Sequence, residues 1–153
     1  MSELVMSAHS QRVFPYLLYE NAAGALDWLV RVFGFHEHLR HVSDDGRVDH
    51  AEISVDRYVI LLAQPQSDYR SKKSRGDSST YIELVIVVDD VEEHFNHAKA
   101  EGARIIREPT QEPWGTKSYR VADLEGRVWE FEQPLEKVAP GDWGAIVKNR
   151  DSE

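Results

Sequence analysis

The chain of 153 residues contains no cysteine. Disulfide bonds, thiolate metal sites and a cysteine nucleophile are therefore excluded. No apolar run approaches the roughly 20 residues that a membrane-spanning helix needs. Residues 1–11 carry neither an apolar core nor a basic leader, so we expect no signal peptide there and a cytoplasmic location for the protein.

Basic residues are also scarce, because 18 Lys and Arg stand against 27 Asp and Glu and give a formal charge of −9. Nucleic acids and anionic membranes are bound through basic patches, so neither is an expected partner. The acidic balance is compatible with a cationic small molecule, and equally with solubility alone. P-loops, glycine-rich dinucleotide motifs and nucleophile elbows are missing as well. The chain does have 41% hydrophobic residues and four Trp, enough to bury a core.

The most informative stretch ends at Gln133-Pro134. It alternates as a strand in which Trp129 and Phe131 point to one face and Glu130 to the other. The segment that ends 69 residues earlier, Asp56–Pro65, has a strand of the same length and the same Gln-Pro ending. This offset suggests an internal duplication.

The same offset relates two helical patterns, and each is closed by a glycine, Gly34 or Gly102. The apolar helix positions Ala22, Leu26 and Leu29 recur as Val91, Phe95 and Ala98. Strands are expected at 12–19, 35–42, 48–55, 58–63, 81–88, 103–107, 117–122 and 127–132, with a loop over 108–115.

The fold class predicted from this pattern is α+β, with two tandem βαβββ modules. Their curved mixed sheets would enclose a cleft, and their helices would cover the outer faces. The predicted parts are an N-terminal tail (1–11), a first module (12–63), a polar connector (64–79), a second module (80–134) and a C-terminal extension (135–153).

Several short motifs carry a resemblance to a known family. They are Pro15–Asn21 with Ala25–Leu29 and Val32–Phe35 in the first half, and Val87–Val91, Glu101–Ala103, Trp114-Gly115 and Val121–Phe131 in the second. Paired modules with these motifs resemble the vicinal oxygen chelate superfamily, which includes glyoxalase I, extradiol dioxygenases and bleomycin resistance proteins. The resemblance covers residues 12 to 134 and points to the fold more than to one activity.

Metal-dependent members of that superfamily hold a divalent ion with four side chains, one from the first and one from the last strand of each module. The resemblance places these positions at Phe14, Leu61, Glu83 and Glu130. Phenylalanine and leucine cannot coordinate a metal, and two carboxylates alone bind a divalent ion weakly. We therefore expect no cofactor, with a divalent metal held by the two carboxylates and His50 as the alternative.

The candidate ligand-binding residues combine an apolar wall with polar anchors. Glu83 and Glu130 would anchor a basic or hydroxyl group, or share a proton as a general acid and base. His50 lies opposite Ala51 and Ile53 on its strand, so it either faces the cleft as a base or donor or lies at the surface. Phe14, Tyr16 and Leu61 would form the apolar wall. Tyr119 is a further candidate because it lies 69 positions after His50. Trp114 would either stack on the ligand or pack over the sheet edge.

The function favoured by these residues is binding of a small organic molecule in the cleft between the modules, without a metal and in a homodimer. The cleft would form either within one chain or across the dimer. One alternative is a metal-dependent lyase, isomerase or dioxygenase of the same superfamily. Another is a metal-free acid/base enzyme that uses Glu83 and Glu130 as its catalytic residues.

Overall fold

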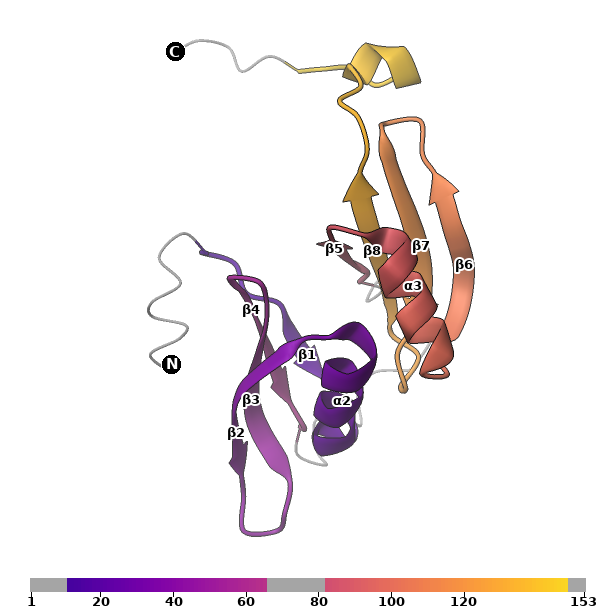
Figure 1. Ribbon diagram of the computed structural model, residues 1–153. Helices are drawn as coiled ribbons and strands as arrows, with labels where there is room; N and C mark the ends of the chain where they lie inside the picture. The colour runs from indigo at the N-terminus through magenta and orange to yellow at the C-terminus, as the bar shows by residue number, and fades with distance from the viewer. Residues whose placement is uncertain (1–10, 66–81, 149–153) are drawn as a thin grey trace, which may run out of the picture. The chain divides into compact units, whose positions relative to one another are not determined.

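The computed structural model describes residues 11–65 and 82–148. Most of the tail (1–11) and of the connector (64–79), and the end of the extension, lie outside these ranges. The chain divides into two compact units, the first of which also includes the turn Asp123–Arg127. Each unit is a βαβββ module, as the pattern predicts (Figure 1).

The first unit contains β1 (Tyr16–Leu18), α2 (Ala22–Trp28), the π-helical turn η1 (Leu29–Phe33), β2 (His36–Val42), β3 (Val48–Val55) and β4 (Tyr58–Ala63). The second contains β5 (Leu84–Val87), α3 (Val91–Ala100), β6 (Arg104–Gln111), β7 (Thr116–Ala122), β8 (Val128–Pro134) and the 3₁₀-helix η4 (Pro140–Trp143). The strand orders are β1-β4-β3-β2 and β5-β8-β7-β6. Only β1–β4 and β5–β8 are parallel pairs, so both sheets are mixed.

In each unit the helix lies against one face of its own sheet (Figure 1). The apolar positions that predicted the helices are buried, and so are the strand residues beneath them. Ala51 and Ile53 of β3, like Trp129 and Phe131 of β8, are fully buried on this side. We call the opposite side of each sheet its open face.

The two helices start alike and end differently. Asn21 and Asp90 cap them by accepting hydrogen bonds from the amides of Gly24 and Glu93. The first helical segment then has one residue more than the second before its closing glycine, and it accommodates this residue in η1. A π-helical turn is the usual way for a helix to hold a single inserted residue.

The segment expected to be a loop before the seventh strand is instead part of β6, which continues through Pro109 to Gln111. β6 is the edge strand of its sheet, and its register with β7 jumps from Arg107 to Thr110. Proline is tolerated at such an irregular edge because no ladder hydrogen bond is required from its nitrogen.

The side chain of His94 on α3 packs against the sheet. Its ring stacks on Phe131 at a centroid distance of 4.0 Å, and its Nδ1 lies 2.6 Å from the hydroxyl of Tyr119. Burial raises the pKa of Tyr119, which therefore stays a phenol in this contact. The contact between the His94 ring and the Tyr119 hydroxyl thus connects α3 to the sheet beneath it.

The turn Asp123–Arg127 packs within the first unit. Tyr19 donates a hydrogen bond of 2.7 Å to Oδ2 of Asp123, and both groups are buried. Burial and the neighbouring carboxylate raise the pKa of Tyr19. Glu125 accepts hydrogen bonds from the amides of Glu20 and Asn21, directly before α2. The turn thus satisfies backbone donors that the helix leaves unpaired.

Candidate functional site

The open face of the second sheet carries a row of four side chains across all four strands. Strand register aligns Val85 with Glu130, Glu130 with Arg120, and Arg120 with Arg107. Ser118, two residues before Arg120 on β7, lies on the same face and is fully buried. Alternation places these residues opposite Tyr119 and Phe131, which lie beneath α3.

Ion pairs connect the polar members of this row. Arg120 Nε lies 2.9 Å from Oε1 of Glu83 and 3.4 Å from Oε2 of Glu130. Arg107 reaches Oε1 of Glu130 at 3.5 Å, Ser118 Oγ at 2.6 Å and Glu112 at 2.7 Å. The structure therefore brings the predicted pair Glu83 and Glu130 together, with an arginine between them.

One oxygen in this network has no hydrogen-bond donor among the described residues. Oε1 of Glu83 is shielded from solvent and accepts no hydrogen bond, although Arg120 Nε is only 2.9 Å away. The N–H of Arg120 is directed at Glu130 instead. The arginine thus attracts the Glu83 carboxylate electrostatically and leaves one acceptor position on it unused.

Carboxylates still outnumber guanidinium groups here. Glu83, Glu112, Glu130 and Glu132 face two arginines. Burial and the charge of Glu130 raise the pKa of Glu132. This open face accordingly tolerates an added positive charge better than an added negative one.

The open face of the first sheet has an equivalent row with different chemistry. Register aligns Tyr16 with Leu61, Leu61 with Glu52, and Glu52 with Leu39. Glu52 is buried, with 1% of its side chain exposed, and its Oε1 lies 3.1 Å from Nε2 of His50. The structure thus places His50 on the open face, which was one of the two predicted placements.

Tyr119 does not share that position, and the expectation that it lines the open face is wrong. Its ring is fully buried against Phe95 and Phe131 beneath α3. The reason is that the turn between β7 and β8 is one residue longer than the turn between β3 and β4, since Ala122 pairs with Val128 whereas Ser54 pairs with Val59. The offset from β3 to β7 is therefore 68 residues (122 − 54), and the structural equivalent of His50 is Ser118.

The family model of the Glyoxalase/Bleomycin resistance protein/Dioxygenase superfamily matches residues 12–131. The chain belongs to this superfamily. TioX from Micromonospora sp. ML1 is similar in structure, with 32% identity, a TM-score of 0.65, and coverage of 84% of this chain and all of that one. Rv0887c of Mycobacterium tuberculosis is 28% identical over 127 residues, which cover 81% of this chain and 75% of that protein. A lactoylglutathione lyase from Agrobacterium tumefaciens shares the fold at 18% identity, with a TM-score of 0.60 over 90% of this chain and 98% of that one.

The side chains at the superfamily's metal positions do not fit a divalent ion. Phe14 and Leu61 offer no ligand atoms, and Glu83 and Glu130 are both paired with Arg120. Within residues 11–65 and 82–148, no group of three or more His, Asp or Glu side chains is arranged to hold a metal. His36 and His38 contact each other edge to face, and Nε2 of His38 lies 2.7 Å from Oγ of Ser54.

The remaining predicted residues have simple placements. Phe14 and Leu61 are half-buried. Trp114 is 43% exposed and meets Trp143 of η4 edge to face at 5.9 Å, so it covers the start of the C-terminal extension. No helix among the described residues is long and apolar enough to cross a bilayer.

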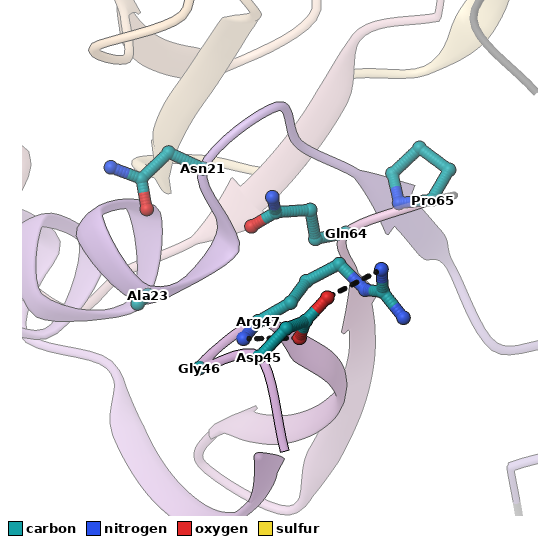
Figure 2. A pocket seen from close by; sticks show the side chains of 7 residues that line it. All are labelled: Asn21, Ala23, Asp45, Gly46, Arg47, Gln64 and Pro65. Atoms are coloured by element: carbon teal, nitrogen blue, oxygen red, sulfur yellow. Dashed lines mark hydrogen bonds and ion pairs between the residues drawn. The ribbon is translucent and has the colours of Figure 1, made fainter. Parts of the chain in front are cut away.

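A pocket of about 400 Å³ lies elsewhere in the first unit, between the start of α2, the β2–β3 turn and the end of β4 (Figure 2). Several of its polar groups are engaged: Asp45 pairs with Arg47, and the side-chain carbonyls of Asn21 and Gln64 accept from helix amides. We assign it no role in binding. Its lining residues are Asn21, Ala23, Asp45, Gly46, Arg47, Gln64 and Pro65.

Three polar residues on the open face of the second sheet escaped the sequence reasoning: Arg107, Ser118 and Arg120. Arg120 had a usable signal, because it alternates with Tyr119 and Val121 in a predicted strand. Arg107 had no comparable signal in the sequence, because its partners depend on which strand pairs with β6 and in which register.

Proposed function

We propose that this protein binds a small organic molecule on the open face of its second sheet and that it does so without a metal. The ligand class that suits this face is apolar, with an ammonium or hydroxyl group that donates hydrogen bonds. The observation that carries the proposal is the Oε1 atom of Glu83, which is shielded from solvent and accepts no hydrogen bond from the described residues. A buried acceptor without a donor is costly, and a ligand donor would remove that cost.

The apolar part of the ligand has a surface beside this acceptor. Val85 and Val87 alternate with half-buried positions on β5 and are 53% and 58% exposed, next to Glu130 and Glu132 in register. Apolar side chains with a few convergent polar groups are the usual composition of a ligand site. The arginines pair with the neighbouring carboxylates and hold them in place.

Arg120 also bears on the acid/base alternative. A carboxylate pair that shares a proton needs direct contact between its oxygens, as in the aspartic proteases. Here a guanidinium group, which does not lose its proton in proteins, stands between Glu83 and Glu130. The geometry therefore favours binding over proton transfer at this pair.

Calorimetric titration with two probes tests the proposal. Tryptamine carries an ammonium group on an indole, and 3-methylindole lacks it. The wild-type protein should prefer tryptamine by about tenfold or more, the effect of one charge-assisted hydrogen bond. Glu83→Gln should reduce that preference to near unity, whereas Glu108→Gln, a change at an exposed carboxylate, should keep it.

The metal-free part is tested in the same titration. Adding EDTA should leave the tryptamine affinity unchanged, and elemental analysis should find less than stoichiometric metal in the purified protein. Loss of binding with EDTA, or a preference that survives Glu83→Gln, would contradict the proposal.

A further inference from the structure

The first unit has a hydrogen-bonded chain of three side chains on its open face. Tyr16 Oη lies 3.4 Å from His50 Nδ1, and His50 Nε2 lies 3.1 Å from Oε1 of Glu52. The three come from β1 and from alternate positions of β3. Their exposure increases along the chain, from 1% at Glu52 to 35% at the His50 side chain and 52% at Tyr16.

The buried carboxylate determines which imidazole nitrogen carries the proton. When Glu52 is ionised, its oxygens can only accept hydrogen bonds, so Nε2 of His50 donates to it. In the neutral ring, Nδ1 then carries the lone pair and faces the hydroxyl of Tyr16. Glu52 therefore positions His50, as the carboxylate of a catalytic triad does.

The hydrogen bond between Tyr16 and Nδ1 of His50 is weak. The distance of 3.4 Å is at the long end for a hydrogen bond from a hydroxyl group, and the tyrosine is half exposed. Its ring also meets the imidazole edge to face at 6.1 Å. A second hydroxyl could replace that of Tyr16 at Nδ1 with little loss.

Other groups around His50 do not compete for this nitrogen. His41, opposite His50 on β2, is paired with Asp49 at 2.6 Å. Leu39 lies opposite Glu52, and Leu61 lies between Glu52 and Tyr16. The surroundings of Nδ1 on this face are therefore apolar or already paired.

We propose that His50, positioned by Glu52, is a proton-accepting anchor for a phenolic hydroxyl group, and that the first sheet thereby forms a binding site of its own. The phenol transfers its proton to Nδ1, and the phenolate and imidazolium remain as an ion pair. The aromatic ring of the ligand packs on Tyr16 and Leu61. This goes beyond the function proposed above, because every residue involved lies in the other unit.

The test compares 4-nitrophenol with 4-nitroanisole, in which a methyl group blocks the hydroxyl. Binding is measured below the pKa of the free phenol, and absorbance distinguishes bound phenolate from phenol. The wild-type protein should prefer nitrophenol by about tenfold or more and show the phenolate band. His50→Gln, whose amide can still donate to Glu52, should lose both the preference and the band, while His41→Gln should keep them.

Equal binding of the two probes by the wild-type protein, binding of neither, or a preference that survives His50→Gln would overturn the proposal. If circular dichroism shows that His50→Gln does not fold, the preference for nitrophenol is measured with Tyr16→Phe instead. This variant removes only the competing hydroxyl, so the preference should increase severalfold; an unchanged or smaller preference would overturn the proposal. Glu83 takes no part in this site. A negative result with the phenol probes therefore does not contradict the function proposed for the second sheet, and a negative result with tryptamine does not contradict the phenol site.

Discussion

The two units have the same topology and nearly opposite chemistry on their open faces. The row Tyr16–Leu61–Glu52–Leu39 of the first sheet corresponds in register to the row Val85–Glu130–Arg120–Arg107 of the second. The buried Glu52 of the first row occupies the position that Arg120 occupies in the second row. On the helix-covered faces the equivalent residues stay apolar or aromatic. Packing against a helix restricts a position to shapes that fill the core, whereas an open face is free to diverge.

Substitutions at equivalent core positions should have the largest effect. Trp129 and Ile60 are buried at the same place in β8 and β4, beneath the helix of each unit. Trp129→Ala should lower the free energy of unfolding by about 3–5 kcal/mol and Ile60→Ala by about 2–5 kcal/mol, since each leaves a cavity. Urea denaturation measures both. A loss below about 1 kcal/mol at either position would show that the two cores are not equivalent.

Two glycines give a sharper contrast between the units. Gly46 and Gly115 hold the same place in the β2–β3 and β6–β7 turns, with φ of +82° and +96°. An added Cβ meets nothing within 4 Å at Gly46 but lies 2.2 Å from the carbonyl oxygen of Glu136 at Gly115. Gly46→Ala should therefore cost about 1–2 kcal/mol, the strain of the left-handed backbone alone. Gly115→Ala should cost more than about 3 kcal/mol, because the C-terminal extension must also move.

Thermal and urea denaturation of the two variants checks this contrast. Similar losses would mean that the close approach of Gly115 to the extension contributes nothing to stability. Gly46→Ala serves as the internal control for backbone strain.

The smallest predicted effects concern two carboxylates whose pKa values move in opposite directions. A hydrogen bond from Arg40 lowers the pKa of Glu37, so its ionised form stabilises the first unit. Burial and the charge of Glu130 raise the pKa of Glu132, so its ionised form opposes folding of the second. Glu37→Gln should thus lower stability at pH 7, and Glu132→Gln should raise it, each by about 0.5–1 kcal/mol.

Both differences should shrink on acidification, as stability curves from pH 7 to about pH 3 would reveal. The contribution of Glu37 is present above the unfolded pKa of glutamate, about 4.3, and disappears as the pH falls through its lowered folded value. The penalty at Glu132 begins to disappear earlier, as the pH falls through its raised folded value, and is gone below the unfolded one. Equal signs at pH 7 would contradict this account.

Much of the fold was predictable because the helix-covered faces have clear periodicity. The positions of Leu26, Phe95 and Trp129 follow from the 3.6-residue and 2-residue spacing of apolar side chains. The placement of Tyr119 was wrong because the turn between β7 and β8 holds one residue more than the turn between β3 and β4, so the offset of 69 that relates β4 to β8 becomes 68 (122 − 54) between β3 and β7.

The site was predictable only in part, for a related reason. Glu83 and Glu130 were found because the resemblance places two of the superfamily's metal positions at these residues. Their connection through Arg120 depends on the strand order β5-β8-β7, which alternation within single strands does not specify. The pairing of Glu52 with His50 was visible as neighbours two apart on one strand, but the burial of that carboxylate was not.

The most direct measurement is a map of amide chemical shifts in the two-dimensional ¹H–¹⁵N spectrum during titration with tryptamine. The proposed function predicts that the perturbed amides cluster at Glu83, Val85, Arg120 and Glu130 and that the shifts are unchanged by EDTA. Perturbations at Asn21, Arg47 and Gln64, which line the pocket of the first unit, would contradict it, as would a spectrum that does not change.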